Sequence, residues 1–274
     1  MPDFRWTECP VLIPYMGGKF ELSRTLVPMI PSHNRYVEVF AGGASMFFRK
    51  KKVQHNILND KHNDLVNLYI CVKEHFDEFK EQTKCYLKSR YLFDDFRRQI
   101  KEVKDISIPD IKRASRYYYV IKNAFNNSVH NPISKEAEWH THMVEFLELS
   151  RKKLDNVMIE NLDFREMITR YPPRSGDFWY LDPPYVIAGE RGDYYFHNFN
   201  SDDHDDFVEM IDELDRKGAY FMVSYDNRQR IKTSFSKYNI KEIPIRYSGQ
   251  LVGSDVKIEL VITNYENRGQ ASLF

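Results

Sequence analysis

The sequence predicts an α/β fold with a mostly parallel sheet. Two observations support this class: short apolar runs of strand length alternate with stretches in which apolar residues recur at helical spacing, and a glycine-rich turn follows the first run. Strands that alternate with helices are joined by crossovers, which place neighbouring strands in parallel. With 274 residues, 42% of them hydrophobic, the chain can bury one large core, or one core and a modest second lobe.

The first half of the chain supplies two strand candidates and the start of a helical region. Residues 35–40 alternate into an apolar run, and residues 41–45 form the glycine-rich turn that leads into a short helix. Residues 57–58 form a second short strand. The apolar spacing from residue 63 onward predicts a long amphipathic helix.

The second half supplies four more strand candidates, at residues 157–160, 178–181, 220–224 and 259–263. A helix over residues 202–216 separates two of them. Acids fill its first turn, and we expect Ser201 to cap it.

Charge is distributed unevenly along a chain whose formal net charge is zero. Residues 61–155 are helix-like and charged, and between Lys80 and Lys122 twelve Lys or Arg stand against six Asp or Glu, a surplus of six. This surplus fits either a nucleic-acid surface or solvated helix faces. If it binds DNA, we expect phosphate contacts from four arginines of this segment, namely Arg97, Arg98, Arg113 and Arg116.

Membrane proteins and secreted proteins are disfavoured by the sequence. No apolar run approaches the roughly 18 residues of a membrane span, and residues 1–6 lack the basic start of a secretory signal. We therefore expect a cytoplasmic protein that makes no membrane contact.

Metal binding is also disfavoured. The cysteines form no CxxC pair, which argues against a disulfide framework and a zinc site; they are Cys9, Cys71 and Cys85. His140 and His142 near Glu145 could be drawn as ligands, but His-x-His with one acid on a helix is more often a polar face. We expect no metal.

The glycine turn and an acid after the next strand predict a nucleoside site. Ligands of doubly wound sheets sit at the carboxyl ends of the strands, where a glycine such as Gly42 allows close backbone approach. Asp60 follows the second strand and can accept hydrogen bonds from ribose hydroxyls, or it can cap the next helix. No GxGxxG motif or P-loop is present, so a nucleoside without a pyrophosphate fits best.

A second polar corner follows the strand at 178–181, with the sequence Asp182-Pro183-Pro184-Tyr185. The prolines have locked φ angles and no backbone N–H, so their carbonyls are left to accept from a ligand. Methylation of an exocyclic amino group needs its lone pair turned toward an electrophile, which two acceptors can achieve. We expect the Asp182 carboxylate and the Pro183 carbonyl to be these acceptors, with Tyr185 stacked on a base flipped out of the duplex. The alternative is a proline-stiffened turn.

Several segments occur in one order along nearly the whole chain. They are Pro14-Tyr15-Met16-Gly17-Gly18-Lys19, Val37-Glu38-Val39-Phe40-Ala41-Gly42-Gly43-Ala44-Ser45, Asn59-Asp60, Asn161-Leu162-Asp163-Phe164, the segment that starts at Asp182, Ser224-Tyr225-Asp226-Asn227, and Glu259-Leu260-Val261-Ile262-Thr263-Asn264-Tyr265. In this order they resemble the Dam-like (D12 class) family of bacterial and phage DNA adenine-N6 methyltransferases.

The resemblance implies a Rossmann-like methyltransferase sheet that uses S-adenosyl-L-methionine, with an inserted, mainly helical target-recognition domain. The catalytic domain would comprise residues 1–60 and 156–274, and the insertion residues 61–155. The implied substrate is double-stranded DNA, and the sequence leaves open whether a cognate restriction endonuclease exists. The cofactor pocket would be lined by Tyr15, Lys19, Phe40, Gly42, Asp60, Asp163, Phe164 and Asp182.

Two positions depart from the family pattern. Ala44 stands where the family often has a second glycine, which predicts a small change in backbone approach. Family members that act on GATC carry an arginine in the recognition hairpin where this chain has His130. An imidazole lacks the guanidinium fork that pairs with guanine, so we expect a target other than strict GATC, with Asn126, Asn127 and His130 near the bases.

Other activities remain compatible with the sequence alone. The same fold could act on cytosine N4, RNA adenine or a protein amide, although the basic insertion favours a nucleic acid. A DNA-binding module without turnover is a further alternative, and the intact acid, proline pair and tyrosine weigh against it. Lys122 or Lys135, in place of the hairpin residues, could read guanine.

Overall fold

A computed structural model describes residues 9–15, 18–103, 105–137, 139, 144, 146–184, 199–245 and 257–266. The chain divides into two compact units. The first takes its described residues from Met1–Arg24, Ala41–Lys52 and Asn56–Asn161, and the second from Thr25–Phe40, Val53–His55 and Leu162–Phe274. Within the described residues no helix combines the length and the apolar character needed to cross a membrane.

The strands form a seven-stranded sheet in the order β3-β2-β1-β4-β5-β7-β6. Their bounds are Arg35–Glu38 (β1), His55–Asn59 (β2), Val157–Glu160 (β3), Asp177–Leu181 (β4), Tyr220–Asp226 (β5), Asn239–Ile245 (β6) and Lys257–Thr263 (β7). β2 pairs with β3, β1 with β4 and β4 with β5 in parallel, whereas β7 is antiparallel to both β5 and β6. The order 3-2-1-4-5 is that of a doubly wound Rossmann sheet, so the predicted α/β class is confirmed.

Strand order reverses between β1 and β4, both in the second unit. At such a switch point the crossovers leave in opposite directions, and a ligand can enter between the strand ends. The register pairs Glu38 with Tyr180, and the Val39 N–H continues the ladder to the Tyr180 carbonyl at 3.1 Å. Phe40 and Asp182 thus follow neighbouring parallel strands at the same level.

Six of the seven strands lie within two residues of the predicted ranges, and β6 was missed. Pro244 interrupts its pattern, and most of its residues are exposed or half-buried, as expected for an edge strand.

The predicted cap of the helix before β5 was wrong by one residue. The helix is α10 (Ser201–Arg216), and its cap is Asn200, whose side chain accepts from the Asp203 N–H while Asp203 bonds back to the Asn200 N–H.

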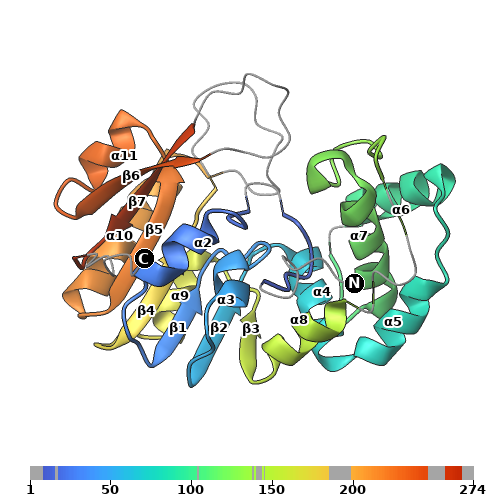
Figure 1. Ribbon diagram of the computed structural model, residues 1–274, viewed down its shortest axis with the longest axis horizontal. Helices are drawn as coiled ribbons and strands as arrows, with labels where there is room; N and C mark the ends of the chain where they lie inside the picture. Colours follow the sequence, from blue (N-terminus) through green and yellow to red (C-terminus); the bar gives the residue numbers. More distant parts are fainter. Residues whose placement is uncertain are drawn as a thin grey trace, which may run out of the picture. The chain divides into compact units, whose positions relative to one another are not determined.

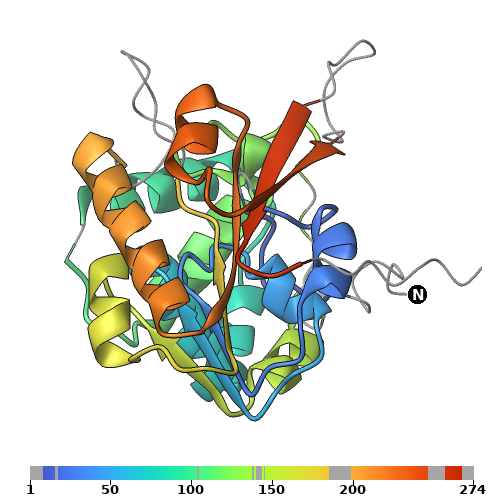
Figure 2. The ribbon, with the colours of Figure 1, turned by 90° about the vertical axis from the view of Figure 1, so that its left-hand side faces the viewer.

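In the second unit, helices cover the sheet. α9 (Phe164–Arg170) precedes β4, α10 packs on β5 and against α9, and α11 (Gln229–Ser234) follows β5. α10 is the long orange helix in Figure 2. All five residues of β4 are buried, which matches its central place in the strand order.

The first unit is mainly helical (Figure 1). Besides β2 and β3 it holds α3 (Ser45–Arg49), α4 (Asn63–Glu74), α5 (Phe76–Lys84), α6 (Arg90–Glu102), α7 (Ile111–Asn123) and α8 (Leu147–Leu154). α7 packs against α4, α5 and α6, and three consecutive tyrosines, residues 117–119, bury their rings there. The helix predicted from residue 63 begins there but ends at Glu74, and α5 follows. The helices α4 to α8 fall within the predicted insertion, although its boundaries stay a prediction.

Candidate active site

The glycine turn of the first unit is held by two side chains from later in the sequence. The Gly42 N–H donates to Oδ2 of Asp60 at 2.8 Å, and the Gly42 carbonyl accepts from the hydroxyl of Tyr69 at 2.8 Å. Asp60 follows β2, and Tyr69 lies on α4 with its side chain buried. Both polar backbone groups of Gly42 are therefore fixed. Sequence reasoning identified Asp60 and missed Tyr69, which reads there as one more apolar position of an amphipathic helix.

Tyr15 packs directly on this turn. Gly42 has φ +49°, and a Cβ added there would come within 3.0 Å of the Tyr15 ring. A Cβ on Gly43 would lie 3.1 Å from the Ile13 carbonyl oxygen and 3.2 Å from Cβ of Tyr15. Two glycines are needed for this close approach. The structure thus brings together the predicted residues Tyr15, Gly42 and Asp60.

Ala44, the departure from the family pattern, also adopts a left-handed backbone, with φ 48° and ψ 40°. This conformation costs an L-residue with a Cβ roughly 1 kcal/mol more than glycine. The turn thus keeps the shape that a glycine would give, at a modest cost in stability.

The Asp60 carboxylate has one backbone donor on each oxygen. Oδ1 accepts from the His62 N–H at 2.9 Å, and Oδ2 accepts from Gly42. Burial raises the pKa of Asp60, and the two N–H groups oppose that rise. A carboxylate offers about four acceptor positions, so two hydroxyl donors can still be accommodated. These open acceptor positions of Asp60 match the two hydroxyls of a ribose.

Asp60 also shapes the start of α4. His62 is the N-cap residue of that helix, and its N–H is the one that Asp60 accepts. The two sequence interpretations of Asp60, ligand contact and helix support, are therefore compatible.

Lys19, which the family resemblance predicts beside the cofactor, is buried.

Four phenylalanines form an aromatic cluster in the second unit. Phe40 lies with its ring centroid 5.7 Å from that of Phe164, 6.3 Å from Phe199 and 6.1 Å from Phe207. Phe164 begins α9 and Phe207 lies on α10. Sequence reasoning found Phe40 and Phe164. The other two carried weak signals: Phe199 directly precedes a helix cap, and Phe207 lies on the apolar face of α10.

Asp163 is the N-cap of α9. Its side chain accepts from the Arg165 N–H at 3.1 Å, and Glu166 completes a capping box. The Arg165 guanidinium lies over the Phe164 ring, 4.4 Å from its centroid, and pairs with three acids: Asp163, Asp203 and Asp206. Arg165 therefore ties α9 to α10 next to the aromatic cluster, a role that the sequence analysis did not anticipate.

The segment Asp182-Pro183-Pro184 leaves the end of β4. Leu181 and Pro183 are buried, whereas Asp182 and Pro184 are half-buried. Asp182 stands beside Phe40 in the register at the switch point, so a polar group and an aromatic ring share this edge of the sheet. Tyr185 lies outside the described residues, as do His140, His142 and Glu145.

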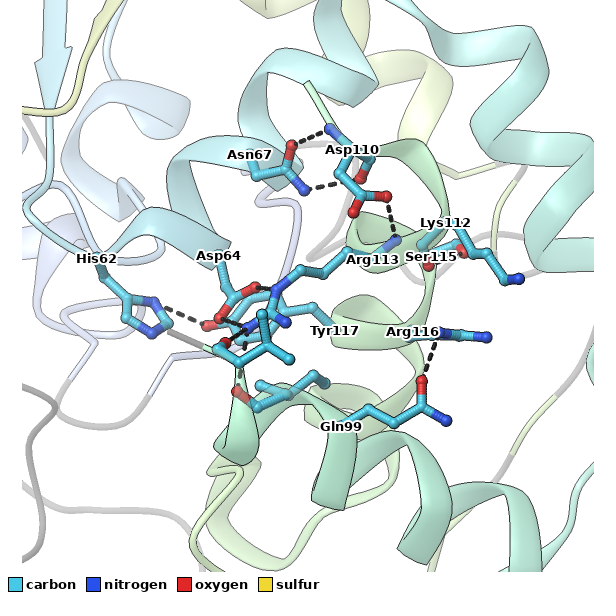
Figure 3. A network of polar contacts seen from close by, with 12 residues as sticks. His62, Asp64, Asn67, Gln99, Asp110, Lys112, Arg113, Ser115, Arg116 and Tyr117 are labelled. Atoms are coloured by element: carbon cyan, nitrogen blue, oxygen red, sulfur yellow. Dashed lines mark hydrogen bonds and ion pairs between the residues drawn. The ribbon is translucent and has the colours of Figure 1, made fainter. Parts of the chain in front are cut away.

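Arg113, predicted to bind DNA, is buried within the first unit (Figure 3). Its guanidinium pairs with both carboxylate oxygens of Asp64 on α4 and donates to the carbonyls of Ile100 and Val103. These acceptors engage the guanidinium inside the protein, which argues against the predicted phosphate contact. The charge count of the segment gave no means to tell a buried arginine from an exposed one.

The other predicted DNA-binding arginines differ from one another. Arg98 is 65% exposed and pairs with Asp95 on its own helix. Arg116 stacks on Phe96 and donates to Gln99. Arg97 donates to the Asn131 carbonyl at 2.9 Å.

The remaining DNA-binding candidates lie on a turn after α7. Asn126 and Asn127 both have positive φ, 50° and 52°. Asn126 and His130 are exposed, and Asn127 is half-buried. Phe125, which begins the turn, is 53% exposed.

A family model described as D12 class N6 adenine-specific DNA methyltransferase matches residues 15–248. The chain belongs to this family. The family and the activity that the sequence predicted are thereby confirmed, and the adenine specificity separates this D12 class enzyme from the cytosine and RNA alternatives.

Curated relatives of this D12 class methyltransferase carry related names. The type II methyltransferase M1.LlaDCHI of Lactococcus lactis subsp. cremoris is 26% identical over 284 residues, which cover 97% of this chain and 96% of that protein. The type II methyltransferase M.MjaIII of Methanocaldococcus jannaschii is 24% identical and covers 94% and 100%, respectively. The modification methylase StsI of Streptococcus sanguinis is 25% identical over 93% of this chain, but over 42% of its own length.

The D12 class methyltransferase thus acts on the N6 amino group of adenine in DNA. Its family and fold imply S-adenosylmethionine as the methyl donor.

Proposed function

We propose that this enzyme methylates an adenine flipped out of duplex DNA at a short specific sequence, with Asp182 and Pro183 as the acceptors for the amino group. The observation that carries the proposal is the position of Asp182 at the switch point, at the end of β4 and level with Phe40 at the end of β1. A polar acceptor and an aromatic ring at the carboxyl edge of a doubly wound sheet suit a purine amino group beside a nucleoside.

The residues of the corner would do the orienting. The Asp182 carboxylate and the Pro183 carbonyl each accept one N–H of the adenine amino group, which turns the nitrogen lone pair out of the ring system. Because Pro183 has a locked φ and the following Pro184 restricts its ψ, its carbonyl keeps its direction. S-adenosylmethionine supplies an electrophilic methyl group on a sulfonium. The methyl group would pass from this sulfonium to the adenine nitrogen, and the Asp182 carboxylate would be the adjacent acceptor for the N6 proton that is released. Tyr185 and Pro184 would complete the base pocket.

In the first unit, Asp60 would accept from the ribose hydroxyls of the donor, beside the Gly42 turn and Tyr15. Lys19, Phe40, Asp163 and Phe164 stay cofactor candidates from the family resemblance, the last three of them within the second unit, around the end of β1 and the start of α9. Two observations support the assignment of Asp60. Its carboxylate has acceptor positions left for hydroxyl donors, and it is bonded to a glycine turn that is too crowded for a side chain.

DNA would be read by the turn after α7. Asn126, Asn127 and His130 carry amide and imidazole groups suited to base edges, and without an arginine at His130 we propose a target other than strict GATC. Lys122 is half-buried and burial lowers its pKa to about 8, so it suits guanine recognition less well than an exposed lysine. Because two of the relatives are named type II methyltransferases, we also propose a cognate restriction endonuclease of the same specificity.

Mapping methylated bases by long-read sequencing of DNA from cells that express the protein tests these points together. We expect N6-methyladenine within one short motif, and none with Asp182→Ala. The matched control is Asp205→Ala, which removes an exposed acid from α10 and should leave methylation intact. Methylation confined to GATC would refute the proposed specificity. Near-normal methylation by Asp182→Ala would refute the catalytic assignment.

A further inference from the structure

The chain between α7 and Ser134 forms a small hairpin, defined here as residues 124–133. Ala124 bridges Ile133 in antiparallel fashion, the Phe125 N–H donates to the Pro132 carbonyl at 2.9 Å, and the Ser134 N–H donates to the Asn123 carbonyl at 2.8 Å. These bonds fix how the two arms of the hairpin pair. They attach the hairpin to the end of α7 and leave open how its return arm lies against α6.

The return arm is tied internally around Asn131. Its N–H donates to the Ser128 carbonyl at 3.0 Å, and its side-chain amide donates to the Phe125 carbonyl at 2.9 Å. The peptide between Asn131 and Pro132 has no N–H, because proline supplies none. The Asn131 carbonyl is therefore the backbone group through which this peptide can be anchored to another element.

Arg97 of α6 provides that anchor. Its guanidinium donates from Nη1 to the Asn131 carbonyl at 2.9 Å, and its side chain is only 28% exposed. The guanidinium also lies over the buried ring of Phe93, 5.6 Å from the centroid. A guanidinium that stacks on a buried ring and donates to a carbonyl holds that carbonyl in place more firmly than an unrestrained surface arginine would.

We propose that Arg97 is a positioning residue for sequence discrimination, which holds the His130–Asn131 part of the hairpin against α6 and does not itself bind phosphate. The inference rests on the proposed function, because it requires that the hairpin reads bases. It replaces the sequence interpretation of Arg97 as a DNA contact. The adjacent residue Arg98 has the same charge on the same helix, is more exposed and pairs with Asp95, so it is the matched comparison.

The experiment compares Arg97→Met with Arg98→Met on short duplexes that carry the mapped wild-type site or that site with one base pair changed. For Arg97→Met we expect the ratio of kcat/KM between the two duplexes to fall by at least about fivefold, with the salt dependence of DNA binding unchanged. For Arg98→Met we expect the reverse: an unchanged ratio and, if Arg98 contacts phosphate, a salt slope lower by about one. Arg97→Lys keeps the positive charge and can still donate to the carbonyl, but it loses the planar group that stacks on Phe93, so it should restore the ratio in part.

Equal loss of kcat/KM on both duplexes, or a flattened salt slope with the ratio kept in Arg97→Met, would overturn the inference. If Arg97→Met does not fold, Arg97→Gln replaces it, since its side chain is polar but too short to reach the carbonyl. Amide hydrogen exchange gives a readout that needs no DNA: Phe125 and Asn131 should lose at least about tenfold protection in Arg97→Met and none in Arg98→Met. Unchanged protection sinks the inference by itself. A wild-type protein that methylates no defined site overturns the proposed function, and the discrimination assigned to Arg97 with it, even where the loss of protection shows that Arg97 holds the hairpin.

Discussion

The backbone N–H of Gly42 donates to the carboxylate of Asp60, eighteen residues further along the chain, at 2.8 Å. This bond joins the turn after β1 to the end of β2. Since Asp60 accepts from His62 with its other oxygen, one carboxylate serves the glycine turn and the start of α4 together. An asparagine could not replace it, because the amide nitrogen would face one of the two N–H donors.

Asp60→Ala should weaken S-adenosylmethionine binding by about 1.5 to 3 kcal/mol through the loss of a charged acceptor. To separate a ribose contact from support of the turn, calorimetry would compare S-adenosylhomocysteine with its 2′-deoxy analogue. A ribose contact predicts that the substitution costs less affinity for the deoxy ligand. Equal penalties for both ligands would show that Asp60 acts by holding the turn, and an unchanged dissociation constant would leave it as helix support.

Tyr69→Phe removes the hydroxyl that donates to the Gly42 carbonyl and leaves the ring in place. We expect the dissociation constant for S-adenosylmethionine to rise about threefold or more and the unfolding free energy to fall by about 1 kcal/mol, because a buried acceptor loses its donor. Tyr86→Phe is the control. It removes a buried hydroxyl bonded to Ser115 at 2.8 Å, in the same unit, and should cost similar stability with no change in cofactor affinity. Similar affinities in both variants would contradict the role of Tyr69.

The strands were predictable because an apolar run of about five residues indicates a buried strand even when the neighbouring strands are unknown, as in β4. β6 escaped because an edge strand needs no apolar pattern on its exposed positions, and Pro244 is tolerated there. Sequence motifs identified Gly42 and Asp60 as site residues, because each follows a predicted strand. Tyr69 and Arg165 could not be found in this way, because Gly42, the partner of Tyr69, and the α10 acids that pair with Arg165 are far away in sequence, and composition carries no such pairing.

Arg113 illustrates the same limit for charge. Buried against Asp64, it should be required for stability: Arg113→Met leaves an unpaired carboxylate, and we expect the unfolding free energy to fall by about 3 to 5 kcal/mol. Burial raises the pKa of Asp64 even beside the guanidinium, so removing Arg113 makes ionised Asp64 less favourable still. Urea denaturation would measure this loss, with Arg98→Met as an exposed counterpart expected to cost less than about 1 kcal/mol. Equal losses in the two variants would exclude a structural role for the buried pair.

Lys122, in the last turn of α7, should give the protein a stability that rises with pH above neutrality. Burial lowers its pKa from 10.5 to about 8. Between these two values the unfolded chain holds more protons than the folded one, so the unfolding free energy increases with pH through that window. From pH 7 to pH 9.5 the gain should be about 1 to 2 kcal/mol.

Lys122→Met should lose this gain and be relatively more stable at pH 7, where the wild-type protein bears the cost of a buried charge. Urea denaturation of both proteins at the two pH values gives the double difference, in which the other titrating groups, the tyrosines included, cancel. Lys101→Met, at an exposed position on α6, should keep the pH dependence of the wild type. Parallel pH profiles for the wild type and Lys122→Met would mean that Lys122 reaches solvent.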